Sequence, residues 1–144
     1  MSQSVSPPFE LTVAVQPADI DQQSHVNNTV YLRWVQDVAT AHWNAAAPEA
    51  MRDSIGWVVL RHEIDYKTPA GLGDEIVLRT WVGQATRVTF ERFTEIRRLS
   101  MGGQQAEAGR QTLLATARTL WVPINPETGK PTRVPSEVRS RFSV

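Results

Sequence analysis

Hydrophobic and polar positions alternate along residues 9–16. The hydrophobic positions are Phe9, Leu11, Val13 and Val15. Alternation with a period of two is typical of a strand that buries one face, and Pro17 cannot donate a hydrogen bond to a strand ladder. We therefore predict a strand that ends at Pro17. Residues 1–8, rich in serine and proline, are predicted to form a mobile tail before it.

A different pattern runs from about Asn28 to Ala46. Few polar residues interrupt its apolar body, among them Arg33, Gln36, Asp37, Thr40 and His42. A stretch that is apolar on nearly all sides is normally a buried helix, and at about 1.5 Å per residue its length would be roughly 25 Å. We predict a long central helix here, which stops before Pro48, and a connection at 48–54.

From residue 55 the pattern favours strands. They are predicted at residues 57–66, 75–83, 87–99 and 111–122, separated by turn-forming residues at 69–74 and by a loop at 100–109. Hairpin-like turns would make these four strands antiparallel. The long apolar helix must be covered, so the sheet is expected to curl around it.

The prediction is therefore a single α+β domain over residues 1–144, with an antiparallel five-stranded sheet wrapped around one central helix. Strand 111–122 is expected to end before Pro123. The C-terminal extension at 125–144 is predicted to contain a turn at 127–130 and a short helix at 135–141.

Composition narrows the classes of function. The chain has 15 basic and 15 acidic residues and no cysteine. A balanced charge gives no general attraction to nucleic acid or to anionic membranes. The absence of cysteine excludes disulfides, a thiolate metal site and a cysteine nucleophile. The N-terminus lacks the features of a signal peptide, and no run approaches the roughly 18 apolar residues of a membrane span. We expect a cytoplasmic protein.

The polar loop at residues 18–28 holds the candidate chemistry. Two carboxylates, a histidine and two asparagines stand where this loop becomes the central helix: Asp19, Asp21, His25, Asn27 and Asn28. The first N–H groups of a helix lack partners and lie at the positive end of its dipole. Acid–base side chains beside such donors suit a reaction that develops negative charge on oxygen. The same residue types also form turns and helix caps, so both readings are open at this point.

Three motifs carry a resemblance to a known family. They are Asp19-x-Asp21-x-x-x-His25-Val26-Asn27-Asn28-x-x-Tyr31-x-x-Trp34, His62-Glu63-Ile64-Asp65-Tyr66-x-x-Pro69-Ala70-x-x-Gly73-Asp74, and Gly129-Lys130-Pro131-Thr132-Arg133-Val134-Pro135. Together with the strand order, they make about residues 8–142 resemble the hot-dog acyl-CoA thioesterases of the 4-hydroxybenzoyl-CoA thioesterase type. One departure is Ser24, which stands where relatives usually have glycine.

This resemblance implies an acyl-CoA thioesterase with the hot-dog fold, which hydrolyses a thioester to a carboxylic acid and free CoA. Asp21 matches the family's catalytic carboxylate, acting as general base or as nucleophile. The backbone N–H of Asn28 would hold the oxyanion. His25 is predicted to be a third catalytic residue with a positioning role, and Asp19 a turn residue.

Substrate contacts are predicted for Asn27, Tyr31, His62 and Arg87. Arg87 is the preferred candidate for a CoA phosphate, because the guanidinium group pairs well with phosphate. CoA belongs to the substrate, so no separate cofactor is expected. The three histidines lack metal-ligand spacing, and no metal is predicted. His42 is expected to be a core histidine.

The resemblance also implies a homodimer or a tetramer of dimers, in which Asp21 of one chain meets the strand near His62 of another. Pairing of two sheets would cover an exposed edge strand. Two other functions are compatible with the fold: a hydratase or dehydratase acting on acyl thioesters, for which His25 and Asp21 would be the acid–base pair, and a module that binds acyl-CoA without turnover.

Overall fold

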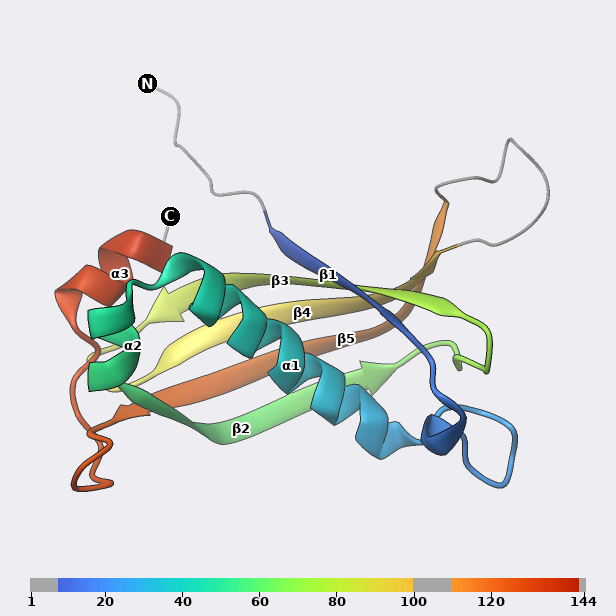
Figure 1. Cartoon of the computed structure of the whole chain (residues 1–144), viewed down its shortest axis with the longest axis horizontal. Coiled ribbons are helices and arrows are strands. Elements are labelled where there is room, and N and C mark those ends of the chain that lie inside the picture. Colours follow the sequence, from blue (N-terminus) through green and yellow to red (C-terminus); the bar gives the residue numbers. More distant parts are fainter. Residues whose placement is uncertain (1–7, 100–109, 143–144) are drawn as a thin grey trace.

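Figure 1 shows the computed structural model, which describes residues 8–99 and 110–142. The elements in chain order are β1 (Phe9–Ala14), a 3-10 helix η1 (Pro17–Asp19), α1 (Asn28–Ala46), α2 (Glu49–Ser54), β2 (Gly56–Tyr66), β3 (Glu75–Ala85), β4 (Phe90–Leu99), β5 (Gln111–Ile124) and α3 (Ser136–Phe142). The predicted loop at 100–109 and nearly all of the predicted tail lie outside the described residues. The connection predicted at 48–54 contains a short helix, α2, and β5 continues through Pro123 to Ile124.

The five strands form one antiparallel sheet in the order β1-β3-β4-β5-β2. This confirms the predicted α+β hot-dog fold. The prediction of a hairpin between β2 and β3 is wrong, because β2 pairs with β5 at one edge and β3 pairs with β1 and β4. The connecting residues 67–74 instead pass over the start of α1. There the Ala70 N–H donates to the Tyr31 hydroxyl at 3.0 Å, and the Val26 N–H donates to the Ala70 carbonyl at 2.9 Å.

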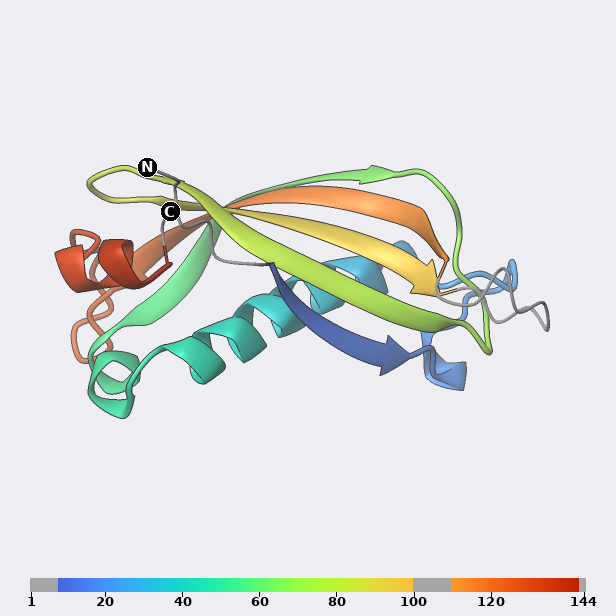
Figure 2. The same cartoon turned by 90° about the horizontal axis from the view of Figure 1, so that it is seen from above.

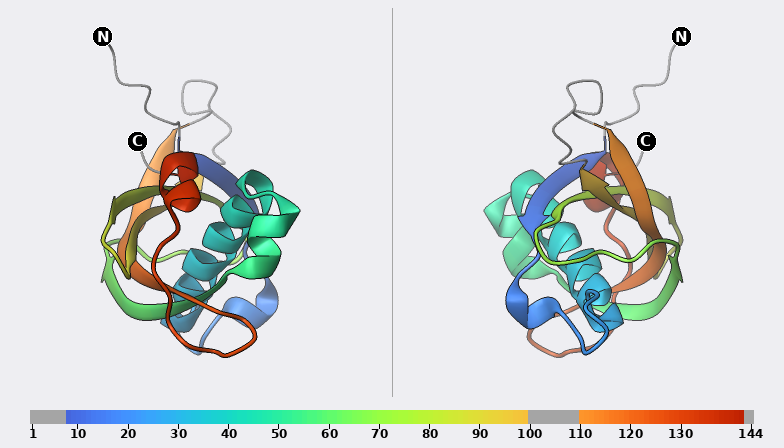
Figure 3. Two further views of the ribbon diagram at one scale, coloured as in Figure 1. Left: turned by 90° about the vertical axis from the view of Figure 1, so that its left-hand side faces the viewer. Right: turned by 90° about the vertical axis from the view of Figure 1, so that its right-hand side faces the viewer.

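Helix α1 crosses the concave face of the curled sheet (Figure 2), and the end-on views show the strands wrapped around it (Figure 3). One face of the helix is buried: Val30, Tyr31, Trp34, Val35, Val38 and Ala39. This spacing places the side chains over the sheet. The expectation that the helix is buried on nearly all sides is wrong for a single chain, because Arg33, Gln36 and Asp37 are not buried and lie on the other face.

A second hydrophobic cluster closes the far end of the sheet. It joins α2, α3 and the end of α1, and its buried members include Met51, Phe90, Val134, Val138 and Phe142. The Val134 N–H donates to the carbonyl of Arg87 in the β3–β4 turn at 2.8 Å, which ties the C-terminal segment to the sheet. Within the described residues, no helix is long and apolar enough to cross a membrane.

The inner face of the sheet also carries buried polar side chains. Thr80, Arg92, Thr94 and Thr119 are each 8% exposed or less. Alternation along β4 places Arg92 on the same face as Phe90, Thr94 and Ile96. Arg92 was not predicted to lie on the inner face, although strict alternation along the strand indicates that position.

Candidate active site

Asp21 closes a tight turn in the polar loop before α1. Its Oδ1 accepts hydrogen bonds from the backbone N–H of Gln23 at 2.8 Å and of His25 at 3.3 Å. The Asp21 N–H in turn donates to the His25 carbonyl at 2.8 Å. Within the described part of the chain, Oδ2 has no hydrogen-bond partner. One oxygen therefore holds the carboxylate in place, and the other is available for chemistry.

Ser24 lies inside this turn and has a φ of 66°, in the left-handed region. Its N–H donates to the Asp21 carbonyl at 3.1 Å, so the left-handed residue is part of the same turn. Serine here takes a conformation that costs most residues about 1–2 kcal/mol and that glycine adopts freely. The turn thus forms without the glycine that relatives usually have at this position.

Replacing Ser24 by glycine is expected to stabilise the chain by about 0.5–1 kcal/mol. The relief of the left-handed strain exceeds the extra backbone entropy that glycine loses on folding. Denaturant unfolding measures the difference. Gln23→Gly is the matched control, because Gln23 is also exposed but does not have a positive φ. We expect that control to be destabilised, and equal effects of the two substitutions would contradict the strain at Ser24.

The start of α1 supplies an oriented donor. Asn27 is the N-cap, and its Oδ1 accepts from the backbone N–H of Thr29 at 3.0 Å and from the Thr29 hydroxyl at 2.9 Å. The N–H of Asn28, the first helical residue, donates to no acceptor among the described residues. The side chain of Asn27 thus caps the helix, and the backbone N–H of the next residue, Asn28, is left available. An unpaired N–H at a helix start is suited to holding a developing oxyanion.

Tyr66 and Tyr31 form the wall opposite the loop. The Tyr66 hydroxyl donates to the carbonyl of Asn28 at 3.2 Å, and its ring meets Tyr31 edge-on with ring centroids 5.2 Å apart. Burial raises the pKa of both phenols, so both remain protonated donors at neutral pH. No role was predicted for Tyr66. It belongs to the second sequence motif and stands at the end of a predicted strand, and this position could have indicated that it reaches the site.

These groups share one cleft of about 450 Å³. Its lining includes five of the seven predicted site residues and Tyr66: Asp21, His25, Asn27, Asn28, Tyr31 and Tyr66. The residues that follow β2, from 67 to 69, complete the wall. Only the fold brings the residues after β2 to the polar loop, because the connection between β2 and β3 passes over the helix start. Most of the predicted site therefore forms one continuous surface.

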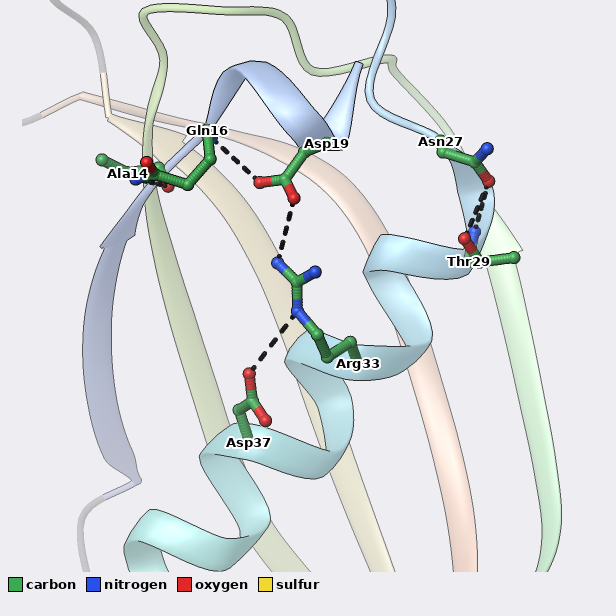
Figure 4. A network of polar contacts seen from close by, with 7 residues as sticks. All are labelled: Ala14, Gln16, Asp19, Asn27, Thr29, Arg33 and Asp37. Carbon is green, nitrogen blue, oxygen red and sulfur yellow. Dashed lines mark hydrogen bonds and ion pairs between the residues drawn. The ribbon is translucent and has the colours of Figure 1, made fainter. Parts of the chain in front are cut away.

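Asp19 holds the loop in place, as expected (Figure 4). Its side chain is buried, accepts from the backbone N–H of Gln16 at 2.9 Å and pairs with the Arg33 guanidinium at 3.2 Å. The carbonyl of Asp19 accepts from the Asn27 N–H at 2.8 Å. Arg33 also approaches Asp37 at 3.9 Å on the next turn of α1. This network fastens the beginning of the loop to the helix that follows it.

Two predicted substrate residues lie outside the cleft of a single chain. His62 lies on the inner face of β2, where its Nδ1 is 3.0 Å from the Thr119 hydroxyl, and burial lowers its pKa. Arg87 is exposed in the turn between β3 and β4, at the end of the sheet away from the polar loop (Figure 1). A contact of Arg87 with the same substrate would need another copy of the chain, and both roles stay predictions.

No three His, Asp or Glu side chains converge on a possible metal position within residues 8–99 and 110–142. His42 is partly buried, with its Nδ1 3.0 Å from the Arg92 guanidinium. Burial and the positive charge of Arg92 lower its pKa to about 4, so His42 is neutral at physiological pH. His42 thus borders the core, between Phe9 and Phe142, and is not fully buried in it as was expected.

The chain shares its fold with solved thioesterase structures. A mutant 4-hydroxybenzoyl-CoA thioesterase bound to 4-hydroxybenzoyl-CoA superimposes with a TM-score of 0.83 at 15% identity, over 96% of this chain and 100% of that one. A thioesterase from Thermus thermophilus in complex with coenzyme A and zinc gives 0.78 at 23% identity, over 96% and 100%. A 1,4-dihydroxy-2-naphthoyl-CoA thioesterase from Synechocystis gives 0.73 at 20%, over 93% and 94%.

Comparison with curated proteins found no significant sequence match. The model of the thioesterase-like superfamily matches residues 15–142, which include the polar loop, the helix and all strands after it. That span contains every residue of the cleft described above. The prediction of a thioester hydrolase is therefore confirmed at the level of the family, and the chain belongs to the thioesterase-like superfamily.

Proposed function

We propose that the chain is an acyl-CoA thioesterase whose reaction takes place in the cleft before α1. One observation carries the proposal: the free oxygen of Asp21 and the unpartnered N–H of Asn28, as far as the described residues go, belong to residues that line the same cleft. The superfamily and the CoA complexes of its structural neighbours support a CoA thioester as substrate.

Two routes fit the geometry. In the first, Asp21 takes a proton from water as the resulting hydroxide attacks the thioester carbonyl carbon. In the second, the carboxylate attacks that carbon directly, and water then hydrolyses the mixed anhydride. In both, the Asn28 N–H stabilises the oxyanion, the C–S bond breaks, and the CoA thiolate leaves and takes up a proton. Such a donor typically contributes about 2.7–4 kcal/mol.

A panel of short, long, branched and aromatic acyl-CoAs tests the proposal, with released thiol followed colorimetrically and the free acid identified by mass. We expect thiol and acid in equal amounts from at least one substrate class. Hydration of an enoyl-CoA without thiol release would instead indicate a hydratase. Saturable binding without any turnover would indicate a binding module. The hydratase has less structural support, because His25 contacts Asp21 through its backbone N–H.

Removing the Tyr66 hydroxyl is expected to lower kcat by roughly 3- to 10-fold with little change in KM. The hydroxyl holds the first turn of α1 through the Asn28 carbonyl, and a hydrogen bond of this kind contributes about 0.5–1.5 kcal/mol. Tyr66→Phe keeps the ring contact with Tyr31, so its melting temperature should stay close to that of the parent. An unchanged kcat would show that the hydroxyl does not position the oxyanion donor.

We further propose a dimer that completes the site. The edge strand β2 exposes Val58 at 44% and Leu60 at 63%, and in the described residues it has a pairing partner only on its β5 side. Pairing with β2 of a second copy would cover these residues and bring His62 toward the partner's cleft. Sedimentation equilibrium measures the mass, and a monomer at micromolar concentration would contradict this arrangement.

A further inference from the structure

A second cavity lies at the opposite end of α1 from the Asp21 cleft. It has a volume of about 70 Å³ and lies between the end of α1, the inner face of the sheet and α3. Figures 1 and 2 show these elements together at the end away from the polar loop. Aromatic rings form much of its wall: Trp43, Trp57, Phe90, Trp121 and Phe142. We call it the distal cavity.

The aromatic wall is held by ring contacts. Trp43 meets Trp57 edge-on at 5.5 Å and stacks on Phe142 at 5.4 Å, and Trp57 lies 6.2 Å from Phe90. These rings come from α1, β2, β4 and α3, so four elements fix the shape of the cavity. Rings packed against each other in this way favour a cavity that exists before a ligand arrives.

Arg92 brings a positive charge to this apolar wall. It is 8% exposed, and its Nη1 donates to the Thr80 hydroxyl at 3.1 Å and meets His42 Nδ1 at 3.0 Å. Neither partner is negatively charged, because His42 is neutral at physiological pH. Within residues 8–99 and 110–142, no carboxylate pairs with Arg92, and its Nε and Nη2 have no acceptor. A buried charge without a counter-charge is strongly unfavourable.

Two indole N–H groups in the wall are out of reach of a ligand in the cavity. The indole N–H groups of Trp57 and Trp121 are buried and have no hydrogen-bond partner among the described residues. Less than 1 Å² of each nitrogen is accessible, so neither N–H can donate to a molecule in the cavity as it stands. Glu91 also lines the cavity, but its carboxylate is engaged by Arg118 at 2.6 Å and by the Gln84 N–H at 3.0 Å. The described part of the wall thus offers the unpartnered N–H groups of Arg92 and no free negative charge.

We propose that the distal cavity binds a small organic carboxylate. The carboxylate group accepts hydrogen bonds from the Arg92 guanidinium, and its apolar end packs among the rings. A cavity of roughly 150 Å³ holds a benzene molecule, so about 70 Å³ suits a carboxylate with one or two additional carbons, such as acetate or propionate. The inference is independent of the chemistry in the Asp21 cleft.

NMR of the indole N–H groups tests the proposal on the full-length chain. The five tryptophans give five indole resonances. The variants Trp57→Phe and Trp121→Phe assign the resonances of the two tryptophans that line the distal cavity. Titration with sodium propionate is expected to shift these two saturably. Propionamide has nearly the same shape but no charge, and sodium chloride controls for ionic strength. Neither should shift the two resonances saturably.

Arg92→Met is expected to weaken propionate binding at least about 10-fold, as the loss of a charge-assisted hydrogen bond predicts. Arg97→Gln is the matched control, because Arg97 lies on the same strand, pairs with Glu95 and does not line the cavity, so it should be dispensable for propionate. Asp21→Asn should also bind normally, which separates this site from the reaction cleft. If Arg92→Met does not fold, Arg92→Gln removes the charge but keeps a polar side chain, and is expected to weaken binding about 3- to 10-fold.

Three results would overturn the proposal. They are no saturable shift at about 50 mM propionate, equal shifts with propionamide, and unchanged binding when Arg92 is replaced. Failure here leaves the thioesterase proposal intact, since that proposal is tested by thiol release at a different cleft.

Discussion

Asp21→Asn is expected to lower kcat at least about 100-fold while the chain stays folded. A general base contributes roughly 100- to 10,000-fold, and asparagine can neither take a proton nor attack the thioester as an anion. The substitution leaves the turn intact, because the side-chain oxygen of asparagine can still accept from the N–H groups of Gln23 and His25. Steady-state kinetics by thiol release, with circular dichroism as the check on folding, measure the effect.

Asp19→Asn is the matched control for this experiment. It removes the same charge two residues away, where the carboxylate pairs with Arg33 in a buried position. We expect a loss of about 1–2 kcal/mol in stability and a kcat within a few-fold of the parent. Near-parental turnover of folded Asp21→Asn would refute both routes proposed for Asp21.

Stability is expected to fall by roughly 2–3 kcal/mol as the pH decreases from about 6.5 to about 4, because of His42. In the folded chain the pKa of His42 is lowered to about 4 by burial and by Arg92, whereas the unfolded value is about 6.5. The unfolded state therefore binds more protons between these values, so acid favours unfolding. The full difference corresponds to about 3.4 kcal/mol, and the partial exposure of the ring reduces it.

His42→Gln separates this contribution from the titration of carboxylates. Glutamine can accept from Arg92 but does not titrate, so the variant should lose most of the slope between pH 6.5 and 4 in urea unfolding. Phe9 and Phe142 pack on the His42 ring at 5.0 and 5.2 Å between ring centroids, and Arg92 is the charged group that contacts it. His62→Gln should remove a smaller part, because burial also lowers the pKa of His62. The same slope in His42→Gln as in the parent would rule out His42 as its origin.

Much of the fold was predictable because its elements are encoded locally. The alternation in residues 9–16 and the apolar stretch from Asn28 to Ala46 correspond to β1 and α1, and α1 has the predicted bounds. The helix start was also predictable, since Asn27 or Asn28 before an apolar stretch is a common N-cap signal. The structure assigns the cap to Asn27 and leaves the N–H of Asn28 available.

Pairing between distant strands was harder to predict. Each strand alternates in much the same way whether its neighbour is β3 or β5, so the pattern of β2 does not show that it pairs with β5. The place of Tyr66 in the cleft depends on that pairing and on the path of residues 67–74 over the helix start. Arg87 was assigned by residue type, and its position at the far end of the sheet depends on the hairpin geometry of the whole chain.

The sequence by itself determined the five strands and the long helix, their order along the chain, and a polar loop with Asp21 before a helix start; it did not show the short helices η1 and α2. These features depend on short-range periodicity, turn chemistry and capping, which neighbouring residues decide. Only the tertiary structure decided which groups come together: Asp21 and Asn28 line one cleft, Tyr66 binds the Asn28 carbonyl, and Arg92 lines the distal cavity with the aromatic rings. These arrangements depend on strand pairing and on the curl of the sheet, because packing brings together residues that are far apart in the chain.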